Sequence, residues 1–337
     1  MKTLMLKADQ TDQAAKIIKN GGLVAIPTET VYGLAADALN GKAVAKIFEA
    51  KGRPMDNPLI VHIADVSQVD RLVSEFPPKA QKLARTFWPG PLTIILPKSE
   101  IIPDEVSAGL DTVAIRLPLH KTARELIAKS SPLAAPSANL SGSPSPTNAR
   151  HVAQDMNGRI DAIIEGGECE VGVESTVITL ATDPPRLLRP GGITVEQLRE
   201  VIGEVEIDDA VLHPLAKGQK AASPGMKYKH YSPKANVILL RGNSGLFADY
   251  INARRTENAV VLCYTEDLGF LKLPCIPMGK SNDYAQHAHK LFASLRIADD
   301  GGFATVYAHC PGTKGEELAV YNRIIRAAGF EVVDLEK

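Results

Sequence analysis

A tract rich in proline, glycine, lysine and histidine interrupts an otherwise regular alternation of helical and strand patterns. It covers residues 204–234 and contains the sequence LHPLAKGQKAASPGMKYKHYSP. Before and after it, short apolar runs alternate with stretches that carry apolar residues at helical spacing, as is typical of α/β sheets. A chain of 337 residues is long enough for two hydrophobic cores. We therefore expect a larger domain at residues 1–203, a linking segment at 204–234 and a smaller domain at 235–337.

The same periodicity predicts where the elements lie. In the larger domain it predicts helices at residues 11–20, 41–50, 79–87 and 120–130, a helix that Thr147 caps and that ends near residue 156, and a helix opened by the capping pair Thr194 and Gln197. Strands are predicted at residues 23–26, 59–63, 92–96, 113–117, 133–135, 162–164, 175–180 and 186–188. In the smaller domain, strands at 237–240, 260–264 and 305–309 and helices at 284–295 and 316–328 predict an open parallel sheet.

The composition excludes several classes of protein. A formal net charge of -1 and an aromatic content of 5% argue against a surface devoted to nucleic acid. The 4 cysteines include no C-x-x-C pair, so we expect no zinc site, no redox dithiol and no disulfide framework. No apolar run approaches the roughly 20 residues that span a bilayer, and the first residues do not resemble a signal peptide. We expect a cytoplasmic protein with no membrane partner.

Two otherwise apolar segments deliver polar side chains of the kind that bind anions. KGRPMDNPLIVHI supplies Lys51 and Arg53, and APSANLSGSPSPT supplies Ser137 and Asn139. A fixed ammonium and guanidinium hold phosphate oxygens, and the small residues and prolines around Ser137 predict a stiff turn that a ligand can approach. The chain has neither a G-x-x-x-x-G-K-[ST] nor a G-x-G-x-x-G motif. We therefore predict a nucleotide-binding anion site without the usual phosphate loop.

The first of these segments has a simpler alternative interpretation. Lys51 and Arg53 follow a helix, and basic residues are favoured at the C-terminal end of the helix dipole in solvent. That alternative explains the charges but leaves unexplained a loop stiffened by two prolines around Asn57. His62, near the end of the following strand, is by itself more typical of a core histidine than of a catalytic one.

Other strands also carry polar residues near one end. PTETVYG places Thr28, Thr30 and Tyr32 directly after a strand, where a substrate-binding role and a capped turn are equally favoured. Arg116 lies in the apolar strand VAIRLP and needs a partner, either a protein carboxylate or a ligand anion. Arg189 in RLLRPGG and Ser175 in GVESTV complete the pattern, which predicts a convergent pocket.

Two further sequence features argue against a serine hydrolase and against a metal site formed by histidines on a helix. Ser137 does not lie in G-x-S-x-G, so a hydrolase nucleophile is not supported. His287 and His289 lack the spacing that places two metal ligands on one helix face, and we expect them at the surface.

Taken together, these segments resemble the YrdC-type threonylcarbamoyl-AMP synthases, in their long two-domain form. PTETVYGL, NPLIVHI, WPGPLT, APSAN, GVESTV and LLRPG occur in the order found in that family, and SPGMKYKHYSP resembles its inter-domain segment. The family's K-x-R…S-x-N tetrad corresponds to Lys51, Arg53, Ser137 and Asn139. The resemblance is strong over residues 5–235 and weaker beyond, where Asn322 and Arg323 carry it. It implies a twisted YrdC-like α/β sheet domain with a cationic concavity, plus a smaller Rossmann-like parallel α/β domain.

The resemblance also implies an activity, that of an L-threonylcarbamoyladenylate synthase, a nucleotidyltransferase. Such an enzyme converts L-threonine, bicarbonate and ATP into threonylcarbamoyl-AMP and pyrophosphate, with Mg2+ on the phosphates and no metal site of the protein's own. Its product feeds a downstream tRNA threonylcarbamoyl-transferase complex, which forms threonylcarbamoyladenosine in tRNA. Direct contact with tRNA is left open.

The resemblance assigns the site residues as follows. Catalytic roles fall to the tetrad Lys51, Arg53, Ser137 and Asn139. ATP is expected to contact Arg53, Asn57, Ser137, Asn139, Arg189, Lys227 and Tyr231, with Lys227, Lys229 and Tyr231 forming a lid over the labile product. L-Threonine is expected to contact Thr30, His62, Arg116 and Ser175, with Arg116 against its carboxylate.

Two alternatives compete with this function. The first is a double-stranded RNA-binding module that uses the cationic concavity; salt-sensitive RNA binding without ATP turnover would favour it. The second is a carbamoyl-transfer enzyme of the kind that matures hydrogenases, but those chains are longer and carry acylphosphatase and zinc-finger segments.

Overall fold

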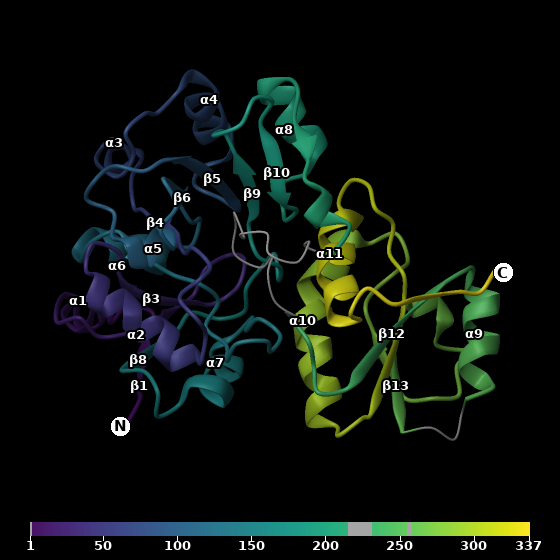
Figure 1. Cartoon of the computed structure of the whole chain (residues 1–337). Helices are drawn as coiled ribbons and strands as arrows, with labels where there is room; N and C mark the ends of the chain where they lie inside the picture. The colour runs from purple at the N-terminus through teal and green to yellow at the C-terminus, as the bar shows by residue number, and fades with distance from the viewer. Residues whose placement is uncertain (1, 215–230, 255–257) are drawn as a thin grey trace. The chain divides into compact units, whose positions relative to one another are not determined.

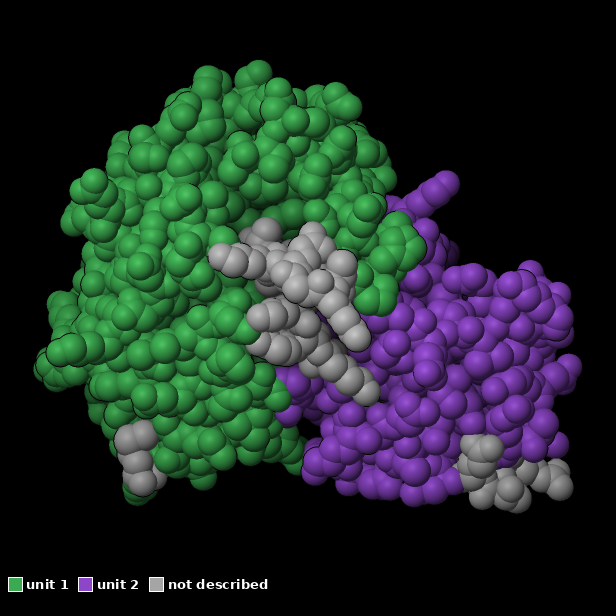
Figure 2. Space-filling view, viewed as in Figure 1, with its two compact units in different colours: residues 1–141, 145–227 green, residues 142–144, 228–337 purple. Residues whose placement is uncertain are grey.

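The computed structural model describes residues 2–214, 231–254 and 258–337 of the chain. Contacts divide it into two compact units (Figure 2): unit 1 comprises residues 1–141 and 145–227, and unit 2 comprises residues 142–144 and 228–337. The domain limits expected from the sequence, 1–203, 204–234 and 235–337, stay predictions. Among the described helices, none is long and apolar enough to cross a membrane.

Unit 1 is built on a mixed sheet whose strands run in the order β1-β8-β2-β3-β7-β4-β6-β5-β9-β10-β11 (Figure 1). The strands are β1 (Leu4–Lys7), β2 (Val24–Ile26), β3 (Gly33–Asp37), β4 (Ile60–His62), β5 (Leu92–Pro97), β6 (Thr112–Arg116), β7 (Leu133–Ala134), β8 (Ala162–Glu165), β9 (Thr176–Thr179), β10 (Arg186–Arg189) and β11 (Glu206–Ile207). The helices are α1 (Thr11–Lys19), α2 (Gly41–Lys51), α3 (Val69–Leu72), α4 (Pro78–Phe87), α5 (Asp104–Ser107), α6 (Lys121–Lys129), α7 (Ala149–Met156) and α8 (Val195–Ile202), with 3₁₀ turns η1 (Val66–Gln68) and η2 (Asp209–Val211).

The elements predicted for this part of the chain are confirmed almost to the residue, and the exceptions have physical causes. The capping box of Thr194 and Gln197 is present at the start of α8. The predicted cap of α7 is wrong: Asn148 caps it by accepting a hydrogen bond from the His151 main-chain nitrogen at 2.9 Å, while the Thr147 hydroxyl lies against the His151 ring. Strand β3 was not predicted, because its sequence GLAAD lacks the β-branched and aromatic residues that favour strands. Strand β1 and the short elements β11, α3 and α5 were not predicted either.

Two local features place residues of the site. Helix α2 begins at the Asn40 cap and ends at Gly52, whose φ of 61° is the left-handed conformation that glycine adopts without strain. Lys51 is therefore the last helical residue, directly before the turn into the next loop. Strands β4 and β6 are parallel neighbours in a register that pairs His62 with Arg116, so both side chains stand at the carboxyl ends of their strands.

Unit 2 is a smaller α/β unit whose sheet has the order β14-β13-β15-β12-β16. Its strands are β12 (Asn236–Arg241), β13 (Ala259–Cys263), β14 (Cys275–Pro277), β15 (Thr305–His309) and β16 (Val332–Asp334), and all of their pairings are parallel, as predicted. Helix α9 (Ser244–Asn252) covers one face, and α10 (Tyr284–Asp300) and α11 (Glu317–Ala327) cover the other (Figure 1), with the 3₁₀ turn η3 (Thr265–Asp267) after β13. Buried residues of β13 and β15 pack with α9 in the core of this unit.

The expected surface location of His287 is wrong. Only 6% of the residue is exposed, because its ring stacks on Tyr264 with centroids 5.1 Å apart and its Nε2 pairs with the Lys280 carbonyl at 2.8 Å. His289, further along α10, is half-buried.

Candidate active site

The loops that follow β2 and β7 run side by side and bring two of the predicted motifs together. An isolated antiparallel bridge pairs Gly33 with Ser137, and the Ala138 nitrogen donates to the Tyr32 carbonyl at 2.8 Å. The segments PTETVYG and APSAN, about a hundred residues apart in sequence, are therefore neighbours along the main chain of one sheet.

Lys51 ties these loops to the end of α2. Its Nζ donates to the Ser137 carbonyl and, at 2.7 Å, to the Asn139 carbonyl, while the Ser141 nitrogen donates to the Lys51 carbonyl at 2.9 Å. Burial, and then the positive charge of Arg53, lowers the Lys51 pKa to about 7. A charged ammonium has three N–H donors, so one is left for a ligand after both carbonyls are bonded.

The remaining members of this group lie in the loop after α2 and in the turn after β7. The Arg53 Nη2 donates to the Asn57 carbonyl at 3.2 Å, and the guanidinium lies 5.7 Å from the centre of the Phe48 ring. Asn57 is fully buried, whereas Ser137 is half-buried. We call Lys51, Arg53, Asn57, Ser137 and Asn139 the lysine cluster.

Arg116, at the end of β6, is held by three partners. Its Nε donates to the Gly90 carbonyl at 3.3 Å, its Nη1 to the Thr30 hydroxyl at 2.9 Å and its Nη2 to the Glu29 carboxylate at 2.7 Å. Each side chain of the Arg116–Glu29 ion pair is 4% exposed. The partner that the sequence demanded is thus a protein carboxylate, and two of the five guanidinium N–H groups have no partner in the described part of the chain.

The hydroxyl groups beside Arg116 have a fixed direction of hydrogen bonding. The single Thr28 hydroxyl hydrogen is donated to the Val31 carbonyl at 2.6 Å. The contact of 2.9 Å between the Thr28 and Thr30 hydroxyls must therefore be donated by Thr30. Because Thr30 also accepts from Arg116, what it still offers to a ligand is a lone pair.

A second guanidinium is attached to the neighbouring strands β9 and β10. These strands are antiparallel, so Arg189 at the end of β10 meets Ser175 just before β9. Arg189 donates from Nε to the Ser175 carbonyl at 3.0 Å and from Nη2 to the Ser175 hydroxyl at 3.1 Å, and that hydroxyl lies 2.7 Å from the Thr93 hydroxyl. Gly191 allows this packing, since a Cβ there would come within 2.4 Å of the Thr176 nitrogen.

His62 completes this side of the site as a neutral ring. Burial, and then the charge of Arg116, lowers its pKa to about 3, and its Nδ1 lies 3.2 Å from the Ile60 carbonyl. His62 can therefore contribute hydrogen bonding and shape at neutral pH but no positive charge. We call Thr30, His62, Arg116 and Ser175 the arginine cluster, and Arg189 lies beside it, bonded to Ser175.

The remaining predicted residues have different outcomes. Lys227 and Lys229 lie outside the described residues. Tyr231 belongs to unit 2, where the centre of its ring lies 5.2 Å from that of Phe292. The Arg323 guanidinium lies 5.5 Å from the centre of the Tyr231 ring. Tyr32, a candidate for substrate contact, instead donates its hydroxyl to the Gly167 carbonyl at 2.8 Å.

Glu29 is a residue of the site that was not predicted from the sequence. It lies in PTETVYG between two threonines that were considered. The signal available was the buried Arg116, which required an acidic partner, but nothing in the sequence indicated which of the chain's carboxylates would supply it.

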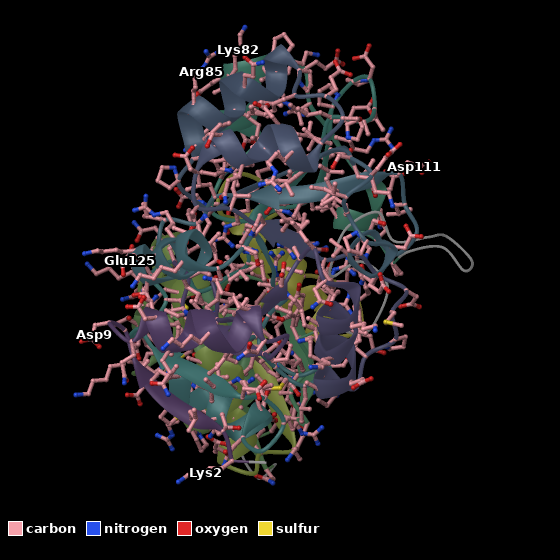
Figure 3. The ribbon with its side chains drawn as sticks, turned by 90° about the vertical axis from the view of Figure 1, so that its left-hand side faces the viewer. Lys2, Asp9, Lys82, Arg85, Asp111 and Glu125 are labelled. Atoms are coloured by element: carbon pink, nitrogen blue, oxygen red, sulfur yellow. The ribbon has the colours of Figure 1, made fainter. Side chains whose placement is uncertain are left out.

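Charged side chains at the periphery of unit 1 differ from those of the two clusters. Lys82 and Arg85 on α4 point outward, as do Asp9, Asp111 and Glu125 (Figure 3). This surface carries both signs of charge, whereas strong binding of RNA backbones requires clustered cations.

Residues 16–191 match the family model described as "Telomere recombination", and residues 193–329 match that of the "Threonylcarbamoyl-AMP synthase, C-terminal domain". Threonylcarbamoyl-AMP synthase of Pyrococcus abyssi is 46% identical over 333 residues, which are 95% of this chain and 94% of that protein. The Bacillus subtilis enzyme of the same name is 46% identical over 331 residues, 96% of this chain and 94% of that one.

A solved structure shows the same fold. The crystal structure of P. abyssi Sua5 complexed with L-threonine has a TM-score of 0.90 and 44% sequence identity, with 99% of both chains covered. The family matches cover both units, and the relatives match nearly from end to end. The chain therefore belongs to the Sua5/YrdC family of threonylcarbamoyl-AMP synthases and is an enzyme of its two-domain form.

Proposed function

We propose that this enzyme makes L-threonylcarbamoyl-AMP and pyrophosphate from L-threonine, bicarbonate and ATP. The observation that carries the proposal is the fixed polarity of the arginine cluster. Arg116 offers two N–H donors beside Thr30, which offers a lone pair. A free amino acid presents the complement, a carboxylate that accepts and an amine that donates. The P. abyssi relative whose structure is described as complexed with L-threonine supports threonine as that amino acid.

In this proposal the amino acid lies against the arginine cluster. Arg116 takes the carboxylate, Thr30 accepts from the amine, and Ser175 and neutral His62 contact the rest of the molecule. A neutral histidine suits this place, because a second fixed cation would repel the ammonium form in which a free amino acid binds. The amine must lose its proton before it can attack a carbonyl carbon.

The nucleotide lies against the lysine cluster. Arg53, Asn57, Ser137 and Asn139 hold ATP, and Lys51 organises the turn from which Ser137 and Asn139 extend. Arg189 adds a guanidinium to the phosphates. Because Arg189 is hydrogen-bonded to Ser175, a residue proposed for ATP touches one proposed for threonine, which suits a reaction that joins the two substrates.

Mg2+ would arrive with ATP as part of the substrate. In the described part of the chain, no group of three or more His, Cys, Asp or Glu side chains could hold a metal ion. In the proposal the ion is bound chiefly by phosphate oxygens and water, the usual state of Mg2+ with nucleotides.

The chemistry asks the protein mainly to position anions and to stabilise charge. The neutral threonine amine attacks bicarbonate with loss of water, or attacks CO2 formed from bicarbonate by that loss and gives up a proton, and in either case a carbamate results. A carbamate oxygen then attacks the α-phosphorus of ATP, and pyrophosphate leaves. The lysine cluster and Arg189 supply N–H donors and positive charge where negative charge gathers on the phosphate oxygens.

The fate of the product is part of the proposal. A mixed anhydride of a carbamate and AMP is an activated acyl donor, so a transferase must consume it; we propose the complex that modifies adenosine in tRNA. We also propose a cytoplasmic location, in keeping with four cysteines that are all free thiols.

The test is threonine-dependent release of pyrophosphate from ATP and bicarbonate, with L-serine as the competing amino acid. We expect release with L-threonine, together with a product of the mass of threonylcarbamoyl-AMP. A folded enzyme that binds ATP but releases no pyrophosphate with any amino acid would contradict the proposal.

A further inference from the structure

We propose that Glu29 is a positioning residue of the amino-acid subsite, which holds the Arg116 guanidinium in the orientation that receives the substrate carboxylate. The inference rests on the proposed function, since it concerns how the same site recognises L-threonine. Glu29 acts through Arg116 in this account and does not itself touch the reacting atoms.

Hydrogen bonds fix Glu29 both at its carboxylate and at its main chain. One carboxylate oxygen accepts from Arg116 Nη2 at 2.7 Å, and the other accepts from the Leu119 main-chain nitrogen at 3.1 Å. Its own carbonyl accepts from the Val171 nitrogen at 2.8 Å. A carboxylate anchored in this way has little freedom to follow a moving guanidinium, so the guanidinium takes its position from the carboxylate.

The buried Arg116–Glu29 ion pair is not explained by a gain in the stability of the fold. Removing two charges from water costs about as much as their attraction returns, and apolar residues often stabilise such positions better. An ordinary ion pair of the same unit, Arg186 with Glu206 at 3.0 Å, has side chains 40% and 47% exposed, where the cost is small. The buried pair beside the candidate substrate site therefore calls for a functional explanation.

The consequence for recognition follows from the donors of Arg116. Its bonds to Gly90, Thr30 and Glu29 fix the plane of the guanidinium and leave one N–H on each terminal nitrogen. Without the Glu29 charge, the Nη2 end loses its strongest partner, and a substrate carboxylate must then order the guanidinium as well as bind it. The cost should appear in threonine binding and leave ATP binding nearly unchanged.

The test compares Glu29→Gln and Glu29→Asp with the wild-type enzyme. Glutamine keeps the size of the side chain but removes its charge, and its amide can satisfy only one of the two donors. A charge-assisted hydrogen bond of this kind corresponds to roughly a tenfold to hundredfold change in affinity. We expect the KM for L-threonine to rise by that factor in Glu29→Gln, with the KM for ATP within about twofold. Glu29→Asp should recover part of the loss.

Two further measurements separate positioning from folding. Glu206→Gln, which breaks the exposed pair, is the matched control and should leave both KM values unchanged. In a cycle with Arg116→Lys, the double variant should lose little more than the worse single variant, since both changes disturb one interaction. If Glu29→Gln does not fold, Glu29→Asp carries the same test with a smaller expected effect.

The outcomes that overturn the inference differ from those that overturn the function. Unchanged threonine KM in a folded Glu29→Gln enzyme, equal increases for threonine and ATP, or additive effects in the cycle would each refute a positioning role. A wild-type enzyme that makes no threonylcarbamoyl-AMP would refute the proposed function instead, and calorimetry of L-threonine binding would then still report on Glu29.

Discussion

The lysine cluster and the arginine cluster of unit 1 use their buried cations differently. Lys51 donates to two main-chain carbonyls and, among the residues that the structure describes, has no carboxylate in hydrogen-bonding contact; its pKa falls to about 7. Arg116 instead has a buried carboxylate partner, Glu29, at 2.7 Å. In the proposed function, the lysine cluster can gain charge when ATP binds, whereas the arginine cluster meets the threonine carboxylate with a guanidinium that Glu29 holds in place.

Removal of the Arg53 guanidinium should have the largest effect on the rate of synthesis. If it had none, the assignment of the lysine cluster to ATP would be wrong. Loss of a positioned charged donor at a phosphate typically costs about 100-fold to 1,000-fold in rate. We expect Arg53→Ala to lose synthesis by at least that factor while circular dichroism and thermal unfolding stay close to wild type. Arg85→Ala, on the outer side of α4 (Figure 3), is the control and should keep full activity. Activity near wild type in Arg53→Ala would refute the assignment.

A methyl group at Gly191 should displace the main chain that carries Ser175 and so disturb the arginine cluster. A Cβ there would lie 2.4 Å from the Thr176 nitrogen and 2.5 Å from the Glu174 carbonyl, so the main chain that carries Ser175 must move. We expect Gly191→Ala to lose about 1–3 kcal/mol of unfolding free energy and to raise the KM for threonine more than that for ATP. Gly192→Ala in the same loop is the matched control, since its Cβ would approach no closer than 3.2 Å, to a Pro91 side-chain atom. Equal behaviour of the two variants would contradict the packing argument.

The titration of Lys51 gives a prediction for the lysine cluster alone. In the free enzyme its pKa is about 7, and bound phosphates favour the ammonium form, so the pKa must rise on binding. At pH 8, ATP binding should therefore take up close to one proton, and ATP affinity should fall as the pH rises above 7. Calorimetry in two buffers of different ionisation enthalpy measures the uptake directly. Lys51→Gln should abolish the uptake, and a wild-type enzyme that takes up none would show that Lys51 is already charged.

Protonation of His62 should lower the stability of the folded protein at low pH. The His62 pKa is about 3 in the folded protein against 6.5 for an unperturbed histidine. Between these values the unfolded chain binds a proton that the folded protein does not, so His62 makes stability fall as the pH decreases from 6.5 toward 3. The contribution to the slope is at most about 1.4 kcal/mol per pH unit. His62→Gln should flatten the profile of unfolding free energy against pH over this window, and an unchanged profile would contradict a neutral, buried His62.

The sequence predicted the positions of elements well, because apolar periodicity and glycine and proline signals are local properties of the chain. It also singled out residues that the structure brings together in both clusters, such as Arg116, whose charge in an apolar strand is visible without a structure; their roles stay predictions. It could not show which donors were already engaged. The bonds of Lys51 to Asn139 and of Arg116 to Glu29 join residues 88 and 87 positions apart, and they depend on strand order and register. For the same reason Glu29 was not selected, although it lies beside two threonines that were.

We propose that the two clusters bind two different substrates. The most direct test of this proposal is a paired measurement of KM for L-threonine and for ATP in Arg116→Lys and in Arg53→Lys, both of which keep the positive charge but lose the planar fork. The account predicts that Arg116→Lys raises the KM for threonine and spares that for ATP, and that Arg53→Lys does the reverse. Parallel increases of both constants in both variants would contradict it.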